Sequence, residues 1–91
     1  MSHATEAMRE AINIAERLPE GSVWSVMVTH DTDCENSAAF NIYVTDDEQR
    51  GRIRRTLGLQ QPDFESDDAE QHDNYPPQRI TISIIEHKES K

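Results

Sequence analysis

Side chains that could bind a metal ion gather in one short run of the chain. Five of them fall within six positions: His30, Asp31, Asp33, Cys34 and Glu35. A calcium loop beginning at Asp31 would need glycine at its sixth position and glutamate at its twelfth, but the sequence has Asn36 and Ile42 there. A zinc site would need three or four cysteine and histidine ligands at paired spacings, and the chain has a single cysteine. The run therefore predicts a solvated polar loop without a metal ion or another cofactor.

Cys34 and His30 are also the residue types of a nucleophile and its general base. A cysteine attacks as its thiolate, and cationic neighbours favour that form. The charged neighbours of Cys34 are instead acids, Asp31, Asp33 and Glu35, which disfavour the thiolate. We expect an incidental thiol, no catalytic residues and a protein that is not an enzyme.

A basic cluster, RGRIRR, contains four of the nine basic residues: Arg50, Arg52, Arg54 and Arg55. Basic clusters can bind phosphate groups, so these arginines are the candidates for nucleic-acid binding. However, Arg50 follows Asp46 by four positions and Arg52 follows Glu48 by four, which is the spacing of favourable helix ion pairs. The favoured interpretation is a solvated, ion-paired helix face. Arg54 and Arg55 have no such local partner, and their alternative roles are phosphate contact or docking of the acidic segment described next.

The acidic segment, residues 60–77, is predicted to be a long loop. It contains six acids and no base, so it carries −6 of the net charge of −9. Irregular connections of this length are uncommon inside compact domains and are usually functional or mobile. The six acids between Asp63 and Asp73 approach the charge density of a nucleic-acid strand, about one charge per 3.4 Å. The plainer interpretation of such a charge run is a solvated connection.

We predict a partner-binding surface on this segment, where carboxylates attract a basic partner and aromatic side chains anchor it. Its residues are Asp63, Phe64, Glu65, Asp67, Asp68, Glu70, Asp73 and Tyr75. Tyr43 is a further candidate anchor.

The composition limits the classes of function that are open to the chain. Ninety-one residues fit a single domain, and 18 acids face 9 bases. This charge repels nucleic acid and anionic lipid, and it attracts basic surfaces such as the nucleic-acid-binding grooves of other proteins. One cysteine excludes an internal disulfide, and neither a signal peptide nor a membrane-spanning run is evident. We therefore expect a cytoplasmic protein.

In size and charge the chain resembles small acidic proteins of phages and plasmids that block host nucleases or CRISPR complexes. The resemblance is one of composition and rests on no motif. With the carboxylates of the acidic segment, we predict a non-enzymatic protein-binding module, an inhibitor or regulator that acts on a basic, nucleic-acid-binding partner. Two alternatives remain: a small accessory domain that homodimerises through its open sheet face, and a nucleic-acid-binding domain that uses the Arg50–Arg55 helix.

Hydrophobic periodicity predicts five elements in the order α-β-β-α-β. Helices are expected over residues 4–18 and 45–57, and strands over residues 22–30, 39–44 and 78–87. Thr45 and Glu48 have the spacing of a capping box, and Gly58 is expected to end the second helix. Residues 88–91 are expected to be a frayed tail.

These elements predict an α+β domain with a three-stranded sheet and two helices packed on one face. A crossover through the second helix makes the third strand parallel to the second, and we expect it beside the first strand. The inward positions are Trp24, Val26, Val28, Phe40, Ile42, Val44, Ile80, Ile82 and Ile84. The opposite face is half polar, and its Met27, Tyr43 and Ile85 are candidates for a dimer patch.

Overall fold

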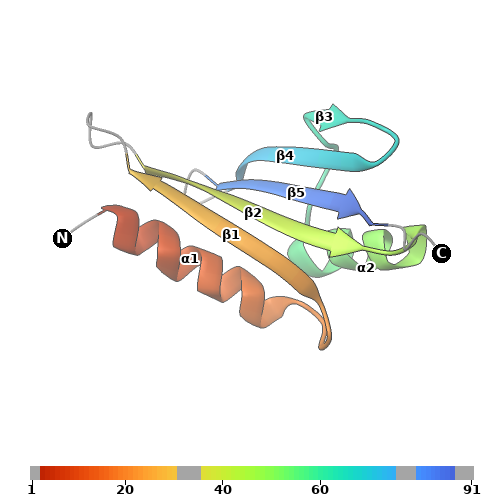
Figure 1. Cartoon of the computed structure of the whole chain (residues 1–91), viewed down its shortest axis with the longest axis horizontal. Helices are drawn as coiled ribbons and strands as arrows, with labels where there is room; N and C mark the ends of the chain where they lie inside the picture. The colour runs from red at the N-terminus through yellow and green to blue at the C-terminus, as the bar shows by residue number, and fades with distance from the viewer. Residues whose placement is uncertain (1–2, 31–35, 76–79, 88–91) are drawn as a thin grey trace.

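The computed structural model describes residues 3–30, 36–75 and 80–87, and it shows an α+β domain with two helices and a five-stranded mixed sheet. Both helices lie on the same side of the sheet (Figure 1). The elements are α1 (His3–Arg17), β1 (Val23–His30), β2 (Asn36–Val44), α2 (Asp47–Leu57), β3 (Phe64–Glu65), β4 (Ala69–Tyr75) and β5 (Ile80–Glu86). Cys34, its acidic neighbours and the predicted tail lie outside the described residues. Neither helix in the described part of the chain has the length and apolarity needed to cross a membrane.

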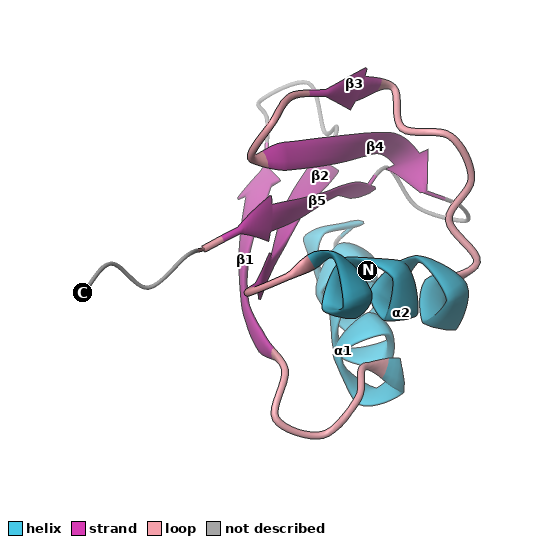
Figure 2. Ribbon diagram, turned by 90° about the vertical axis from the view of Figure 1, so that its right-hand side faces the viewer, coloured by secondary structure: helices cyan, strands magenta, loops and turns pink. Residues whose placement is uncertain are grey.

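The sheet has the strand order β1-β2-β5-β4-β3. β2 and β5 are parallel, as the crossover through α2 predicts, and the other neighbouring strands are antiparallel. The predicted position of β5 beside β1 is wrong, because β5 pairs with β2 from Ala38–Ile80 to Val44–Glu86. β1 therefore lies at one edge of the sheet and β3 at the other (Figure 2).

The acidic segment supplies two strands, and the predicted three-stranded sheet is wrong for this reason. Phe64–Glu65 and Ala69–Tyr75 form an antiparallel hairpin, β3–β4, and β4 continues the sheet beside β5. Glu70 and His72 lie opposite two buried isoleucines of β5, so they occupy inward positions of β4. Inward positions are normally apolar, and a strand with charged or polar residues there lacks the usual alternation.

The core lies between the inner face of the sheet and the two helices. As predicted, the inward residues of β2 and β5 are buried: Phe40, Ile42, Val44, Ile80, Ile82 and Ile84. The helices contribute Ala7, Ala11 and Ile14 from α1, and Ile53 and Leu57 from α2. All these residues belong to one cluster, which confirms that both helices pack on one face.

β1 departs from the predicted core. Trp24, Val26 and Val28 pair with buried residues of β2, so they project from the inner face. Trp24 is nevertheless 42% exposed and Val26 37% exposed, while Val28 is partly buried against the core. The reason is the strand order, because an edge strand has a neighbour on one side only and α1 packs across both β1 and β2.

Local hydrogen bonds define both ends of α2. Asp46 is its N-cap and accepts from the amide of Gln49 at 2.9 Å, while the side chain of Gln49 accepts from the amide of Thr45 at 2.9 Å. The predicted capping box of Thr45 and Glu48 is therefore displaced by one residue, because Asp46 provides the capping oxygen. Gly58 ends the helix as predicted, in the left-handed conformation with φ 67°. Ile53 and Leu57 pack into the core, and Arg50 is buried on the same helix.

Candidate functional site

Glu70 is the centre of a buried cluster of charged side chains between α2 and β4. Its side chain is fully buried. Arg54 Nε donates to both carboxylate oxygens, at 3.0 and 2.8 Å, and Arg54 Nη2 also donates to Oε1. His72 Nε2 lies 2.7 Å from Oε2, within hydrogen-bond distance. Both oxygens of Glu70 thus have partners, which a buried charge requires.

Arg50 extends this cluster to β5. Its Nη1 lies 3.7 Å from Oε1 of Glu70, and its Nη2 donates to Oε2 of Glu86 at 2.8 Å. The spacing of the sequence predicted an ion pair between Arg50 and Asp46. Asp46 instead caps α2, and the Arg50 side chain is turned inward, with 8% of the residue exposed. Two arginines one helical turn apart, Arg50 and Arg54, therefore hold β4 and β5 against α2.

The cluster sets the protonation state of Glu70. Burial is the largest single influence, and alone it would raise the pKa of this carboxyl group. The hydrogen bonds from Arg54 and His72 act in the opposite direction, and together with the charges of these two residues they hold the pKa of Glu70 below its ordinary value. The hydrogen bond with Glu70 likewise raises the pKa of Arg54. Glu70 is therefore an ionised, internally paired carboxylate at neutral pH.

Sequence reasoning missed His72 and Glu86 as members of this cluster. His72 follows Glu70 by two positions, which is the spacing of neighbours on one face of a strand. That spacing, together with an Arg54 that lacked a local partner, was the available signal. One of the roles predicted for Arg54 was to bind the acidic segment to the rest of the domain. Arg54 does so through its contacts with Glu70.

The predicted partner-binding role of Glu70 does not fit its position. A fully buried carboxylate that is paired with two arginines presents no surface to a partner. The other five predicted acids of the segment are exposed: Asp63, Glu65, Asp67, Asp68 and Asp73. The structure thus divides the acids of the segment into one internal anchor and five surface carboxylates.

Two of the surface carboxylates brace the hairpin. Asp63 Oδ2 accepts from the amide of Asp73 at 2.7 Å, and the amide of Asp63 donates to the carbonyl of Gln71 at 2.8 Å. Asp73 Oδ1 accepts from Gln71 Nε2 at 2.9 Å and from Thr81 Oγ1 at 3.3 Å. Changes at Asp63 or Asp73 would therefore disturb the hairpin itself as well as its charge.

The turn between β3 and β4 presents acids together with an aromatic side chain. Asp67 and Asp68 lie in this turn, directly after Glu65 and Ser66. Phe64 is 58% exposed, and its pairing with β4 directs it to the outer face of the sheet, away from the helices. An exposed phenylalanine beside carboxylates is the combination predicted for a partner-binding surface. For Tyr75 the structure describes the backbone but not the side chain.

The basic cluster is divided between the interior and the surface. Arg50 and Arg54 are committed to the buried carboxylates, whereas Arg52 and Arg55 are exposed. Phosphate recognition by a basic patch needs several cations that face outward together. The four arginines therefore do not face outward together as a single basic patch.

The outer face of the sheet carries little charge. Of the described strand residues that project from it, one is charged, Asp73. The predicted dimer residues Tyr43 and Ile85 are direct neighbours there. Met27 is separated from them by a polar row that consists of Ser25, Asn41 and Ser83. The three predicted dimer residues thus do not form one continuous patch.

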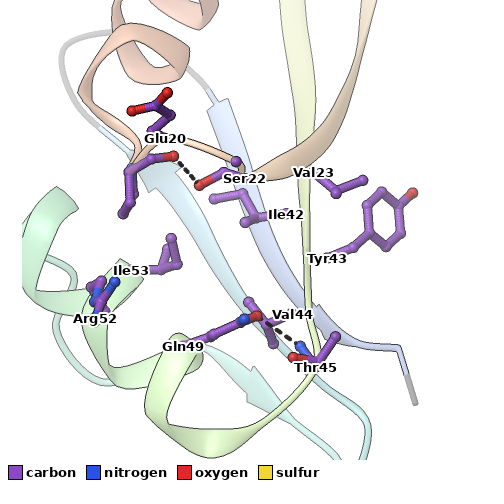
Figure 3. A pocket seen from close by; sticks show the side chains of 12 residues that line it. Glu20, Ser22, Val23, Ile42, Tyr43, Val44, Thr45, Gln49, Arg52 and Ile53 are labelled. Atoms are coloured by element: carbon purple, nitrogen blue, oxygen red, sulfur yellow. Dashed lines mark hydrogen bonds between the residues drawn. The ribbon is translucent and has the colours of Figure 1, made fainter. Parts of the chain in front are cut away.

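A small cleft lies between the start of β1, the end of β2 and α2 (Figure 3). Its volume is about 200 Å³, and its ionisable lining residues include Glu20, Tyr43 and Arg52. Sites for small molecules usually have about 300–1,000 Å³. We therefore do not assign an active site to this cleft.

Within the described residues, no group of three or more histidine, cysteine, aspartate or glutamate side chains is placed to hold a metal ion. Comparison with protein-family models, with curated proteins and with solved structures finds no match for this chain. The β3–β4 hairpin and the cluster that holds it are thus identified as the candidate site from geometry and charge alone.

Proposed function

We propose that this domain is a non-enzymatic protein-binding module that engages a basic partner through the β3–β4 hairpin. The observation that carries the proposal is the division among the acids of the acidic segment. Glu70 is ionised and paired with Arg54 inside the domain, while five acids and Phe64 remain on the surface of the same acidic segment. An internal anchor beneath an exposed charged surface suits a rigid binding element.

Rigidity matters because ordering a mobile loop on binding reduces affinity. The hairpin is held by its pairing with β5, by Arg54 on Glu70, and by the Asp63–Asp73 hydrogen bond. Its carboxylates are therefore placed before a partner arrives. The net charge of −9 attracts a basic partner from a distance, and a few buried contacts then determine how long the complex lasts.

The chemistry of the hairpin defines the partner. Closely spaced carboxylates match a surface that is rich in lysine and arginine, and nucleic-acid-binding grooves are such surfaces. Phe64 adds an aromatic group, which suits an apolar pocket at the margin of that surface. A domain that occupies such a groove would act as an inhibitor or regulator of a nucleic-acid-binding protein.

Quantitative affinity capture tests this proposal. The immobilised domain is exposed to a lysate of its source organism, beside a hairpin variant that combines Phe64→Ala with Asp67→Asn and Asp68→Asn. Glu20→Gln with Glu48→Gln is the control, since it removes two exposed acids elsewhere. We expect a basic protein that the wild type and the control retain and the hairpin variant loses. Equal retention by all three would contradict the proposal.

The accessory-domain alternative is favoured by the low charge of the outer sheet face. Tyr43 and Ile85 are neighbours on that face, so a homodimer formed there would bury both. Replacement of Ile85 by lysine would then abolish self-association, which sedimentation velocity measures. An Ile85→Lys variant that associates like the wild type would exclude this face.

A further inference from the structure

An apolar groove runs along the open edge of the sheet, between β1 and α1. Its volume is about 320 Å³, and it is lined by Met8, Ala11, Ile12, Trp24, Val26 and Val28. Met8 and Ile12 are 53% and 55% exposed, although their side chains are fully apolar. Contiguous exposed apolar surface of this kind marks a site of interaction.

β1 lacks the features that normally protect an edge strand. Edge strands usually carry charged side chains, proline or bulges, which prevent pairing with another strand. The eight residues of β1, VWSVMVTH, include no Asp, Glu, Lys, Arg or Pro, although 30% of the whole chain is charged. β1 also pairs with β2 without a register shift. Its free edge can therefore accept a further strand.

We propose that this edge binds β1 of a second copy of the chain, antiparallel and about a two-fold axis at Val26. In that register Val26 lies opposite its counterpart, and Trp24 of one copy lies opposite Val28 of the other. These residues all project from the inner face, so the two grooves merge into one apolar layer. The same surface serves both copies, as an isologous interface requires.

The charges beside the groove favour a second copy over an unrelated partner. Arg9 precedes Ile12 by three positions and Glu16 follows it by four, so both flank Ile12 on the surface of α1. α1 and β1 run in opposite directions (Figure 1), and Ile12 and Val26 line the same groove. A two-fold axis at Val26 therefore makes the two α1 helices antiparallel near Ile12. Arg9 of one copy then faces Glu16 of the other, twice by symmetry.

The net charge points in the same direction. Two copies that each carry −9 repel one another wherever their acids meet. The acidic hairpin lies at the opposite edge of the sheet from β1. Pairing at β1 thus keeps the most acidic surfaces far apart and leaves both hairpins open.

Trp24 reports directly on this interface. It is the single tryptophan of the chain, and its ring stacks on Phe40 at a centroid distance of 5.3 Å and an interplanar angle of 17°. Its exposed side faces the groove and would become covered in the dimer. Tryptophan emission should therefore shift to shorter wavelength as the protein concentration rises.

Sedimentation velocity and tryptophan emission, from micromolar to hundreds of micromolar protein, test the proposal. We expect a monomer–dimer equilibrium, and Val26→Lys should weaken it at least about tenfold because two lysines would meet at the axis. Phe64→Lys is the matched control, since it places lysine at an exposed apolar position on the opposite edge. A monomer at every concentration, or equal effects of both variants, would overturn the proposal. If Phe64→Lys loses partner capture but still dimerises, the dimer interface and the proposed partner-binding surface are different surfaces.

A charge exchange on α1 gives a second test that does not alter the core. Arg9→Glu places like charges opposite each other and should weaken the dimer about fivefold. Addition of Glu16→Arg in the same chain should restore the wild-type affinity. If the double variant does not restore the affinity, the interface lies elsewhere. The same conclusion would follow if Ile85→Lys abolished the dimer and Val26→Lys left it intact.

Discussion

Arg54 of α2 and Glu70 of β4 form a two-pronged ion pair in which the carboxylate is fully buried and the guanidinium is partly exposed. The pair joins the basic cluster to the acidic segment, which the sequence presents as separate features. Together with the pairing of β4 with β5, it holds the hairpin against α2, because β4 carries Glu70 at an inward position. The position of the exposed carboxylates of the hairpin thus depends in part on a contact whose carboxylate is buried in the interior.

Glu70→Gln should destabilise the domain by about 3 kcal/mol, because it removes the buried charge that pairs with Arg54 and leaves Arg50 with Glu86 alone. For a domain of this size we expect the melting temperature to fall by more than about 10 °C. Thermal unfolding followed by circular dichroism measures the change. Asp68→Asn is the control and should shift stability by no more than about 0.5 kcal/mol, since its side chain is exposed. Equal melting temperatures for the two variants would show that the ion pair does not hold the hairpin.

The same pair predicts how stability depends on pH. The pKa of Glu70 is lowered in the folded state, so as the pH falls the unfolded state takes up this proton first. The stabilisation that ionised Glu70 contributes is complete above the ordinary carboxyl pKa of about 4.3. It is lost as the pH falls through the lower pKa that Glu70 has in the folded state. Urea unfolding of wild type and Glu70→Gln between neutral and acidic pH measures it. The stability difference should be largest at neutral pH and shrink on acidification; a constant difference would contradict the assigned ionisation.

The apolar pattern predicted much of the fold. The alternation of Phe40, Ile42 and Val44 with polar residues identified β2, and three isoleucines identified β5 in the same way. The parallel direction of these two strands followed from the intervening helix, but their pairing did not, because β5 was expected beside β1. Their neighbours in the sheet could not be predicted, because periodicity shows which side of a strand is buried but not which strand lies beside it.

The acidic segment shows where such prediction ends. A strand whose inward residues are Glu70 and His72 has no apolar alternation, so its composition indicated a loop. Glu70 can be buried because Arg50 and Arg54 of α2 contact its carboxylate. Arg54 lies 16 positions before Glu70 in the sequence, so this contact is not a local one. Composition did predict that carboxylates of this segment would be exposed, and it could not show which one turns inward.

Phe64→Ala should shorten the lifetime of a complex with the captured partner. A buried aromatic anchor contributes mainly to the dissociation rate, and we expect that rate to rise about 30-fold. Surface plasmon resonance with immobilised partner measures it. Met27→Ala is a suitable control, because Met27 is 66% exposed on the same outer face at the far edge of the sheet. If both variants dissociate at the wild-type rate, Phe64 is not an anchor.

The ionic-strength dependence of association with the captured partner tests the role of the hairpin most directly. Association rates are measured by stopped flow for wild type, for Asp67→Asn with Asp68→Asn, and for the control Glu20→Gln with Glu48→Gln. Both double variants lose two charges, so an effect of total charge alone would be equal in the two. We predict that the hairpin variant associates more slowly at low salt and shows a shallower decline with added salt than the control, because its steering charges lie at the interface. Identical rates and salt slopes for the two variants would contradict the proposal that the β3–β4 hairpin meets the partner.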